Sequence, residues 1–423
     1  MKHIPRISSV QGTVSAPSSK SYTNRALLLA AMSEGDTTIA NALVADDSHY
    51  MLEALRKIGF TIEGTLRSEV TIGPRRTMSA NEEELFIGNA GTAMRFLTGW
   101  LPFVPGRFLL TGEDRMLERP IGDLVDALEQ VGAEIEYRGA EGFPPIGIRG
   151  SRMRGGFDMR ISGRLSSQFV SALMMGGATL PYGVNLVIDD LVSRPYIEIT
   201  RSVLEAFGAE VEWVDDGRIS VRGSVQSLAR YEVEGDYSSA SYWFTIPAIV
   251  RGSIEVNGLR RASVQGDRLY LDVLQSLGCS VEWQGDSVQV SGHGPIRGGV
   301  FDMNAIPDIV PTLAAVAPLA TDAIEITNVA NLRVKESDRI AVLATELRKL
   351  GATVDERDDG LRIEPGWNED PVVINPHADH RMAMAFAIAG LARGNVTIDD
   401  ERVVGKSYPG FWTTLDRLAG QAN

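Results

Sequence analysis

The most regular feature of the chain is a hydrophobic and polar pattern that recurs and ends in glycine. Amphipathic segments finish with Leu-x-x-apolar-Gly, and a short run of alternating polar and apolar residues follows, as in residues 204–208 and then 210–213. Glycine at such a place favours a left-handed helix end, and the alternation is typical of a strand with one exposed face. The copies end at Gly59, Gly132, Gly208, Gly278, Gly351 and, in a variant copy, Ala419. Their spacing of about 70 residues predicts one supersecondary unit repeated six times.

Each unit carries a second helix that is apolar almost all round. A helix that is apolar on every side belongs in a core. The predicted buried helices cover residues 26–32, 93–101, 169–175, 240–250, 310–320 and 382–392. We therefore predict an α/β fold in which a β-rich shell surrounds buried helices. At 423 residues the chain exceeds what one core usually supports, so three units in each of two domains is the natural division.

Small, hydroxylated and charged residues gather where the buried helices begin. A helix N-terminus presents free N–H groups and roughly half a positive charge, which makes it an anion site. If the units pack as two threefold domains, six such termini can face one cleft between the domains. The pattern predicts a site for ligands with several phosphates and carboxylates. The equivalent starts are Ser21, Thr92, Ser167, Ser239, Ile309 and Arg381.

Composition and charge argue against several classes of protein. A net charge of −14 argues against a nucleic-acid or anionic-membrane binder. Small anionic substrates stay possible, because screening confines surface-charge effects to about 8 Å. No apolar run approaches the roughly 18 residues of a membrane span, and the first residues lack a signal core. The single cysteine, Cys279, excludes an internal disulfide and fits a reducing cytoplasm, so we expect a cytoplasmic protein.

Two helix starts carry more charge than a simple cap requires. Lys20 and Arg25 lie in the first turns of a predicted helix, where the dipole disfavours cations unless an anion binds there. Arg119 precedes a proline at a helix start, which favours a bidentate contact to a carboxylate or phosphate over a solvated turn. The loop 88–92 permits close backbone approach by a ligand but matches no nucleotide motif. Asp236 before its helix is explained by ordinary N-capping.

The C-terminal half supplies a candidate acid/base pair. Residues 333–339 are dense in charge, which in isolation indicates a solvated face. Asp308, however, lies between a proline and an apolar helix, where an unpaired carboxylate would be costly. Asp308 and Glu336 are therefore the candidate pair. His377 and His380 give only a weak metal signature, which the neighbouring Arg381 disfavours further, so we expect no metal and no other cofactor.

With these clusters in view, the chain resembles the 5-enolpyruvylshikimate-3-phosphate synthases over essentially its whole length. This resemblance implies two domains of three βαβαββ units each, an inside-out α/β barrel architecture that stays open until ligands close the cleft. It implies a monomer with one domain of residues 1–14 plus 235–423, another of residues 15–234, and the active site between them. The motifs that carry it are residues 17–25, 88–95, 118–120, 166–168, 193–196, 331–339, 379–382 and 406–409.

The resemblance also implies an activity, the transfer of the enolpyruvyl group of phosphoenolpyruvate to the 5-hydroxyl of shikimate-3-phosphate in aromatic amino-acid biosynthesis. The hydroxyl adds to C2 while C3 is protonated, and the tetrahedral intermediate then loses phosphate and a methyl proton. Asp308 is the implied base for the hydroxyl, and Glu336 the implied acid and later base at carbon, with Lys20 beside them. A ring of Lys and Arg side chains would supply the electrostatic stabilisation.

The same resemblance divides the binding residues between the two substrates. The phosphoshikimate groups are Lys20, Ser21, Arg25, Ser166, Ser167, Gln168, Ser193, Asp308, Asn331 and Lys335. The phosphoenolpyruvate groups are Lys20, Asn89, Gly91, Arg119, Gln168, Arg339, His380, Arg381 and Lys406. One departure from the pattern is Phe96, which stands where many family members have proline and leaves the detailed shape of the phosphoenolpyruvate pocket open.

Two other functions compete with this interpretation. UDP-N-acetylglucosamine enolpyruvyltransferases share the fold and the chemistry but carry a reactive cysteine in a mobile loop. Cys279 instead follows a glycine at a helix end and is predicted to be a buried strand residue. A non-catalytic anion-binding relative is the second alternative. The presence of Lys20, Asp308, Glu336 and Lys406 argues against it.

Overall fold

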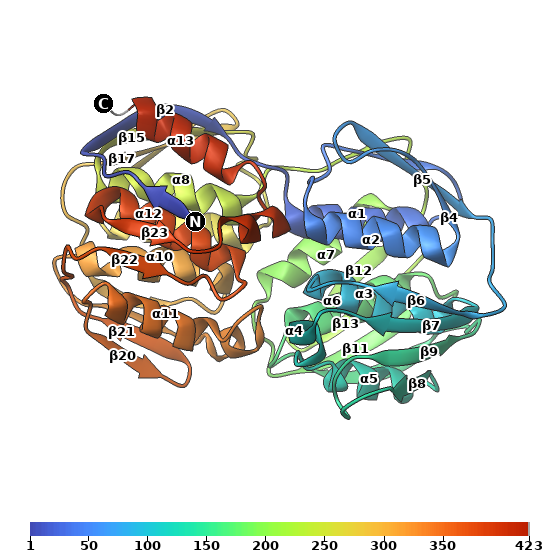
Figure 1. Cartoon of the computed structure of the whole chain (residues 1–423). Coiled ribbons are helices and arrows are strands. Elements are labelled where there is room, and N and C mark those ends of the chain that lie inside the picture. The colour runs from blue at the N-terminus through green and yellow to red at the C-terminus, as the bar shows by residue number, and fades with distance from the viewer. Residues whose placement is uncertain (422–423) are drawn as a thin grey trace. The chain divides into compact units, whose positions relative to one another are not determined.

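The computed structural model describes residues 1–421 of the chain. These residues form two compact units, one made of Met1–Pro17 with Glu234–Asn423 and one made of Ser18–Val233 (Figure 1). The second unit is thus an insertion in the first. The boundaries that the sequence suggests, at 14/15 and 234/235, stay a prediction. No helix in the described part of the chain is both long and apolar enough to cross a lipid bilayer.

Small sheets with one recurring strand order build both units. In one of them β6 (Glu82–Phe86) runs parallel to β7 (Gly106–Thr111), β7 is antiparallel to β9 (Ile146–Gly150), and β9 pairs with β8 (Glu134–Tyr137). Helices connect β6 to β7 and β7 to β8, which completes a βαβαββ unit. The strands that build other sheets on this plan include β4 (Phe60–Gly64), β5 (Glu69–Arg75), β10 (Phe157–Ser162), β11 (Val184–Asp189), β12 (Glu210–Asp215), β13 (Arg218–Arg222), β16 (Ser280–Gln284), β17 (Ser287–Gly292), β18 (Gly299–Asp302), β19 (Ile324–Thr327), β20 (Val354–Arg357), β21 (Gly360–Ile363) and β22 (Val372–Ile374).

Three sheets are completed by strands that are far away in the sequence. The insertion therefore interrupts a repeat unit, because β2 belongs with elements that follow residue 233. The C-terminal sheet is closed by the first strand of the chain and has three strands instead of four. The pairs are β14 (Tyr231–Glu232) parallel to β3 (Thr37–Ala40), β2 (Ser9–Ser15) parallel to β15 (Arg251–Asn257), and β1 (Lys2–Ile4) antiparallel to β23 (Val396–Ile398).

The six predicted buried helices are confirmed. They are α1 (Lys20–Met32), α3 (Gly91–Trp100), α6 (Ser167–Ala178), α8 (Tyr237–Ile249), α10 (Val310–Val316) and α12 (His380–Arg393). Several begin before the apolar run does, because their first turns carry the polar residues that the pattern of apolar residues alone misses. The helix predicted over 310–320 is shorter, since Pro318 lacks the N–H that an α-helix needs and the chain continues as the 3-10 helix η4 (Ala317–Leu319).

The amphipathic helices alternate with the buried ones along the chain. Gly59 and Gly351 follow two of them with φ angles of 110° and 88°, the left-handed ending that the pattern predicted. The sixth copy is different and corrects the prediction, because Ala419 lies inside its helix and the helix continues to Gln421. Alanine has no preference for the left-handed conformation that would stop the helix there. These helices are α2 (Asp46–Ile58), α5 (Gly122–Glu129), α7 (Pro195–Ala206), α9 (Tyr270–Ser276), α11 (Arg339–Lys349) and α13 (Phe411–Gln421).

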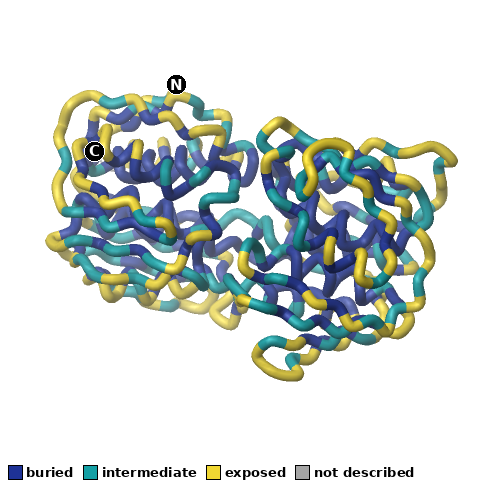
Figure 2. Tube along the Cα trace, turned by 90° about the horizontal axis from the view of Figure 1, so that it is seen from below, coloured by how far each residue is buried: buried dark blue, intermediate teal, exposed yellow. Residues whose placement is uncertain are grey.

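Each unit has its own hydrophobic core around its buried helices. In the first unit α10 packs against α12 and α8, and in the second α6 packs against α3 and α7. The buried stretches of the chain run through the interior of each unit, and exposed stretches lie at its edges (Figure 2). Short helices complete the chain: α4 (Asp114–Leu117), η1 (Leu101–Phe103), η2 (Gly266–Leu269), η3 (Pro307–Ile309), η5 (Ala330–Val334) and η6 (Glu401–Lys406).

Candidate active site

In the first unit, the two candidate acid/base carboxylates meet on one guanidinium. Arg339 is the first residue of α11 and is only 1% exposed. Its Nη1 donates to Asp308 Oδ1 at 3.0 Å and its Nη2 to Glu336 Oε2 at 2.9 Å. Its Nε donates to Asp379 Oδ2 at 2.8 Å. Burial opposes the positive charge, but the three carboxylates outweigh burial and raise the pKa of Arg339 above its ordinary value.

Arg381 adds a second cation to this cluster. It lies in the first turn of α12, and its Nη2 donates to Asp308 Oδ2 at 2.7 Å. Asp308 therefore carries an arginine on each carboxylate oxygen, which compensates a carboxylate that would be costly alone. The side chain of Asp308 keeps 19% of its surface exposed, so a ligand can still reach it.

Asp379 fixes the beginnings of α11 and α12 to each other. It is completely buried, and its Oδ1 accepts from the backbone N–H of Arg381 at 3.0 Å. Its Oδ2 accepts from Ser337 Oγ at 3.1 Å as well as from Arg339. Asp379 lies in the motif 379–382, but the sequence analysis gave it no catalytic or binding role, although an acidic residue directly before an apolar helix was a visible signal. His380 beside it has no exposed surface, with its Nδ1 3.7 Å from Asp379 Oδ1.

The charged segment 333–339 divides into an exposed part and a buried part. Arg333 binds Asp338 at 3.0 Å and Glu356 at 3.3 Å on the outside of the unit. Glu336 and Arg339 are buried. The solvated-face interpretation therefore holds for only some of these charges. Three further candidates lie in this unit: Asn331 within η5, Lys335 directly after it and Lys406 at the end of η6.

In the second unit, a guanidinium lies directly against the glycine-bearing loop. Arg119 is 3% exposed, and its Nη1 donates to Asn89 Oδ1 at 3.0 Å. A Cβ placed on Gly91 would come within 2.5 Å of Arg119 Nη2. Glycine is therefore required for Arg119 to lie where it does. The structure brings Asn89, Gly91 and Arg119 together at the start of α3.

The start of α6 adjoins the start of α3. Gln168 Nε2 donates to Thr92 Oγ1 at 3.3 Å. Ser166 acts as an ordinary N-cap, because its Oγ accepts from the Gln168 N–H at 3.2 Å, and Ser167 opens the helix. Ser193 is buried with a φ of 55°, two residues before α7 begins. Thr92, Ser166, Ser167 and Gln168 therefore lie together where α3 and α6 begin.

Arg25 is buried among helices of the second unit. Its Nε donates to Thr200 Oγ1 at 2.7 Å, and its Nη2 donates to Ser171 Oγ at 3.3 Å and to the Tyr196 carbonyl at 3.0 Å. Its Nη1 donates to the Ser21 carbonyl at 3.0 Å. Burial lowers the pKa of Arg25 to about 10. Arg25 therefore ties α1 to α6 and α7, a structural role beside the binding role predicted for it.

Lys20 has an acidic partner that the sequence analysis missed. Its Nζ lies 3.3 Å from Asp47 Oδ2, and Asp47 is 1% exposed in the first turn of α2. An acidic residue in a first helical turn is common, so the sequence held no signal that singled out Asp47. The pair holds the Lys20 ammonium at the start of α1.

Two minor predictions concern Asp236 and Cys279. Asp236 caps α8 as predicted, because its Oδ1 accepts from the Ser239 N–H at 2.7 Å. Cys279 is buried as predicted, but it lies directly before β16 and not within a strand. Burial raises the pKa of its thiol to about 11, which makes it a poor nucleophile.

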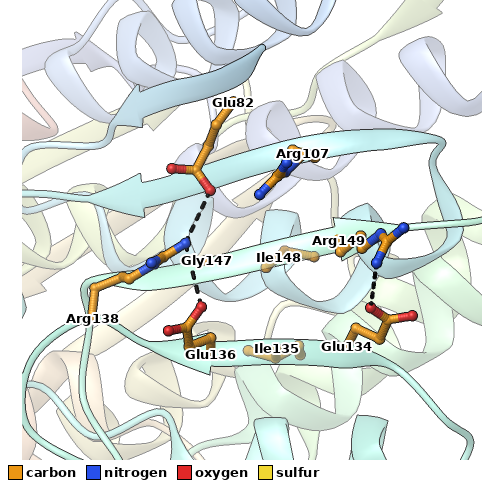
Figure 3. Close-up of a pocket in the computed structure, with 9 residues that line it drawn as sticks. All are labelled: Glu82, Arg107, Glu134, Ile135, Glu136, Arg138, Gly147, Ile148 and Arg149. Carbon is orange, nitrogen blue, oxygen red and sulfur yellow. Dashed lines mark hydrogen bonds and ion pairs between the residues drawn. The ribbon is translucent and has the colours of Figure 1, made fainter. Parts of the chain in front are cut away.

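A pocket with a volume of about 240 Å³ lies elsewhere, on the sheet β6-β7-β9-β8 (Figure 3). Two of the arginines that line it pair with neighbouring carboxylates, Arg138 with Glu82 at 3.3 Å and Arg149 with Glu134 at 3.4 Å. No candidate site residue lines it. Within residues 1–421, His, Cys, Asp and Glu side chains form no group of three suited to hold a metal ion.

The whole-chain comparison decides the family. Residues 4–415 match the family model of EPSP synthase (3-phosphoshikimate 1-carboxyvinyltransferase). The chain belongs to the EPSP synthase family. Similar members are the 3-phosphoshikimate 1-carboxyvinyltransferases of Shewanella woodyi, 43% identical with 98% of both chains covered, and of Klebsiella pneumoniae, 44% identical with 98% of this chain and 97% of the relative covered.

Solved structures agree with this family assignment. EPSP synthase from Acinetobacter baumannii has a TM-score of 0.80 and 27% identity, with 99% of this chain and 97% of that chain covered. The enolpyruvyl transferase NikO from Streptomyces tendae has a TM-score of 0.79 at 18% identity, with coverages of 99% and 96%, and supports the fold alone. The predicted fold class, an α/β fold of repeated units with buried helices, is confirmed.

Proposed function

We propose that this chain transfers the enolpyruvyl group of phosphoenolpyruvate to the 5-hydroxyl of shikimate-3-phosphate and releases phosphate. The observation that carries the proposal is the cluster in which Arg339 binds both Asp308 and Glu336, within a chain whose residues 4–415 match the EPSP synthase family. The reaction needs two groups that move protons and several cations for anionic substrates, and the candidate residues supply both.

Asp308 is the proposed base for the substrate hydroxyl. As an ionised carboxylate it accepts the hydroxyl proton while the oxygen forms a bond to C2 of phosphoenolpyruvate. Its two arginine partners, Arg339 and Arg381, favour that ionised form. When the intermediate collapses, the bond from C2 to the phosphate oxygen breaks and Asp308 returns its proton to the departing phosphate.

Glu336 is the proposed acid and base at carbon. Its proton goes to C3 in the addition step, and the carboxylate takes a proton back from the methyl group as the double bond re-forms. Without substrate, Arg339 donates to Glu336 and so favours the carboxylate. A bound phosphoenolpyruvate anion competes for Arg339, which would weaken that bond and help Glu336 to hold its proton.

The remaining candidates are the proposed anion-binding groups. For phosphoshikimate they are Ser21, Arg25, Ser166, Ser167, Ser193, Asn331 and Lys335, and for phosphoenolpyruvate they are Asn89, Gly91, Arg119, Arg339, His380, Arg381 and Lys406, with Lys20 and Gln168 serving both. We propose that both units act on the same pair of substrates. We also propose a cytoplasmic monomer, which size-exclusion chromatography with light scattering tests for the oligomeric state.

A phosphate-release assay with matched acceptors tests the proposal. Purified protein receives phosphoenolpyruvate with shikimate-3-phosphate, with UDP-N-acetylglucosamine, or with no acceptor. Phosphate release only with shikimate-3-phosphate supports the proposed reaction. Phosphate release only with UDP-N-acetylglucosamine would show that the chain is a UDP-N-acetylglucosamine enolpyruvyltransferase. A folded protein that binds phosphoenolpyruvate and shikimate-3-phosphate without turnover would be a non-catalytic relative.

A further inference from the structure

Glu346 is an exception in the internal repeat. In the four copies of the amphipathic helix that end before glycine in the rest of the chain, the equivalent residue is apolar: Ala54, Ala127, Val203 or Val273. In the fifth copy it is Glu346, which has no exposed surface at all. A carboxylate at a core position is costly unless it is paired and hydrogen-bonded. Its presence there therefore points to a specific task in this unit.

The carboxylate of Glu346 binds the segment that leads into α12. Its Oε2 accepts from the Asn375 N–H at 3.2 Å, and its Oε1 lies 3.0 Å from His377 Nε2. Lys349 lies against both oxygens at 2.7 and 2.8 Å and balances the charge. Asn375 Oδ1 in turn accepts from the His377 N–H at 2.8 Å. We call Glu346, Asn375 and His377 the Glu346 latch.

The segment held by the latch has a backbone that needs support. His377 and Ala378 are consecutive left-handed residues with φ angles of 51° and 55°. Such conformations are unfavourable for residues other than glycine and persist where the surroundings hold them. The next residue is Asp379, which binds Arg339 and caps the helix that carries Arg381.

The latch and the active-site cluster lie on the same helix. Arg339 and Glu346 are seven residues apart on α11, about two turns, and so face the same side. Glu346 holds the beginning of the segment 375–379, and Arg339 holds its end through Asp379. The segment is therefore fastened to α11 at both ends, which sets the position of Arg381 in the first turn of α12.

We propose that Glu346 and His377 are positioning residues for phosphoenolpyruvate binding, which they support by holding the segment that carries Asp379 and Arg381. The proposal rests on the proposed function for its substrate. Neither side chain needs to touch the ligand. Loss of the latch releases the left-handed turn and lets Arg381 shift, and a displacement of about 1 Å is enough to weaken binding or catalysis strongly.

Glu346→Val is the sharpest variant, because valine occupies the same position in α7 and α9 and should fill the core. We expect the melting temperature to be unchanged or higher, the KM for phosphoenolpyruvate to rise about tenfold, and the KM for phosphoshikimate to change less than about twofold. His377→Leu should reproduce this split, and His377→Gln, which keeps a donor near the Nε2 position, should restore most of the affinity. Glu205→Val, which removes an exposed ion pair from α7, is the matched control and should leave both KM values unchanged.

Amide hydrogen exchange tests whether the Glu346 latch holds its segment, independently of any measurement of activity. In Glu346→Val, the amides of residues 375–381 should exchange faster while the rest of α12 keeps its protection. A lower melting temperature with both KM values unchanged would show a merely structural glutamate and overturn the proposal, as would unchanged exchange in this segment. If the wild-type protein releases no phosphate, the proposed function fails and with it the substrate of this proposal, and the exchange result still decides whether the latch holds the segment.

Discussion

The guanidinium carbon of Arg25 lies 4.9 Å from the centre of the Phe96 ring. Phe96 is fully buried in α3, so the ring supports a cation that also binds α6 and α7. A buried contact of this kind contributes about 1–2 kcal/mol. The residue that departs from the family pattern therefore contacts a proposed phosphoshikimate group, whereas the sequence had placed its effect on the phosphoenolpyruvate pocket.

Replacing Phe96 by leucine should loosen Arg25. We expect Phe96→Leu to raise the KM for phosphoshikimate by up to about five- to thirtyfold, as the contact energy implies, with a smaller change for phosphoenolpyruvate. Phe207→Leu is the control, since Phe207 is equally buried in the same unit and its ring contact is to Tyr231. An equal change in both variants would mean that core packing and not the arginine contact is responsible.

Gly91→Ala should displace Arg119. The new methyl group would lie 2.5 Å from Arg119 Nη2, so the guanidinium must leave its bond to Asn89. Because the clashing atoms are the end of a flexible side chain, the fold should tolerate the change, and the loss falls on the contact between Arg119 and the ligand. A hydrogen bond to a charged group contributes about 1.5–3 kcal/mol, which predicts a loss of phosphoenolpyruvate affinity of roughly 10- to 150-fold. Titration calorimetry of both ligands measures it. Gly122→Ala, where the nearest atom to the new methyl group would be Gly142 Cα at 3.4 Å, should bind like the wild type. Unaltered phosphoenolpyruvate binding in Gly91→Ala would remove Arg119 from the site.

Glu336→Gln and Asp308→Asn should each abolish most turnover. A positioned acid or base contributes roughly 10²- to 10⁴-fold, and both changes keep the side-chain shape. Stopped-flow measurement of phosphate release gives the rate, and circular dichroism checks the fold. A folded variant with wild-type turnover would exclude that residue from proton transfer.

The stability of the fold should change with pH as Asp267 loses its proton. Asp267 is a buried residue of η2 whose carboxylate accepts from Ser238 Oγ. Burial, followed by the charge of Asp308, raises the pKa of Asp267 to about 7. Because the pKa of Asp267 in the native protein lies above its value in the unfolded chain, the protonated carboxyl group favours folding. This contribution to the free energy of unfolding is complete below about pH 4 and is lost as the pH rises through about 7. Asp267→Asn should therefore be more stable than the wild type at pH 8, by up to a few kcal/mol, and the difference should disappear towards pH 4.

Urea unfolding at pH 4, 6 and 8 measures this difference. Asp272→Asn on α9 is the control, because Asp272 is exposed and should show no such trend. A difference that stays constant with pH would mean that Asp267 does not titrate between these values.

The repeat made much of the fold predictable from the sequence. Apolar periodicity found the buried helices, and the glycines at 59 and 351 marked the helix ends, because both signals are local. The strand pairs β14–β3 and β2–β15 were not predictable in this way, since they join residues separated by roughly 200 or more positions with short runs that carry little pattern. Their pairing depends on the completed units.

The site was predictable in its residue types and less so in its contacts. Lys20 and Asp308 stood out because charges at the starts of apolar helices are unusual, and Arg339 was implied by the family resemblance. Their partners did not, since Asp47 looks like an ordinary acidic first turn. Glu346 looks like an exposed position of an amphipathic helix, and only burial in three dimensions shows that it is internal. The roles of Asp47 and Glu346 both depend on contacts between segments that are distant in the sequence.

The central claim is that the Arg339 cluster serves enolpyruvyl transfer to shikimate-3-phosphate. The most direct measurement follows phosphate release and the shikimate product together by ³¹P NMR in one sample. The account predicts one phosphate released for each enolpyruvyl ether formed, no release without shikimate-3-phosphate, and loss of both signals in Glu336→Gln. Phosphate release that does not depend on shikimate-3-phosphate, or full product formation by Glu336→Gln, would contradict it.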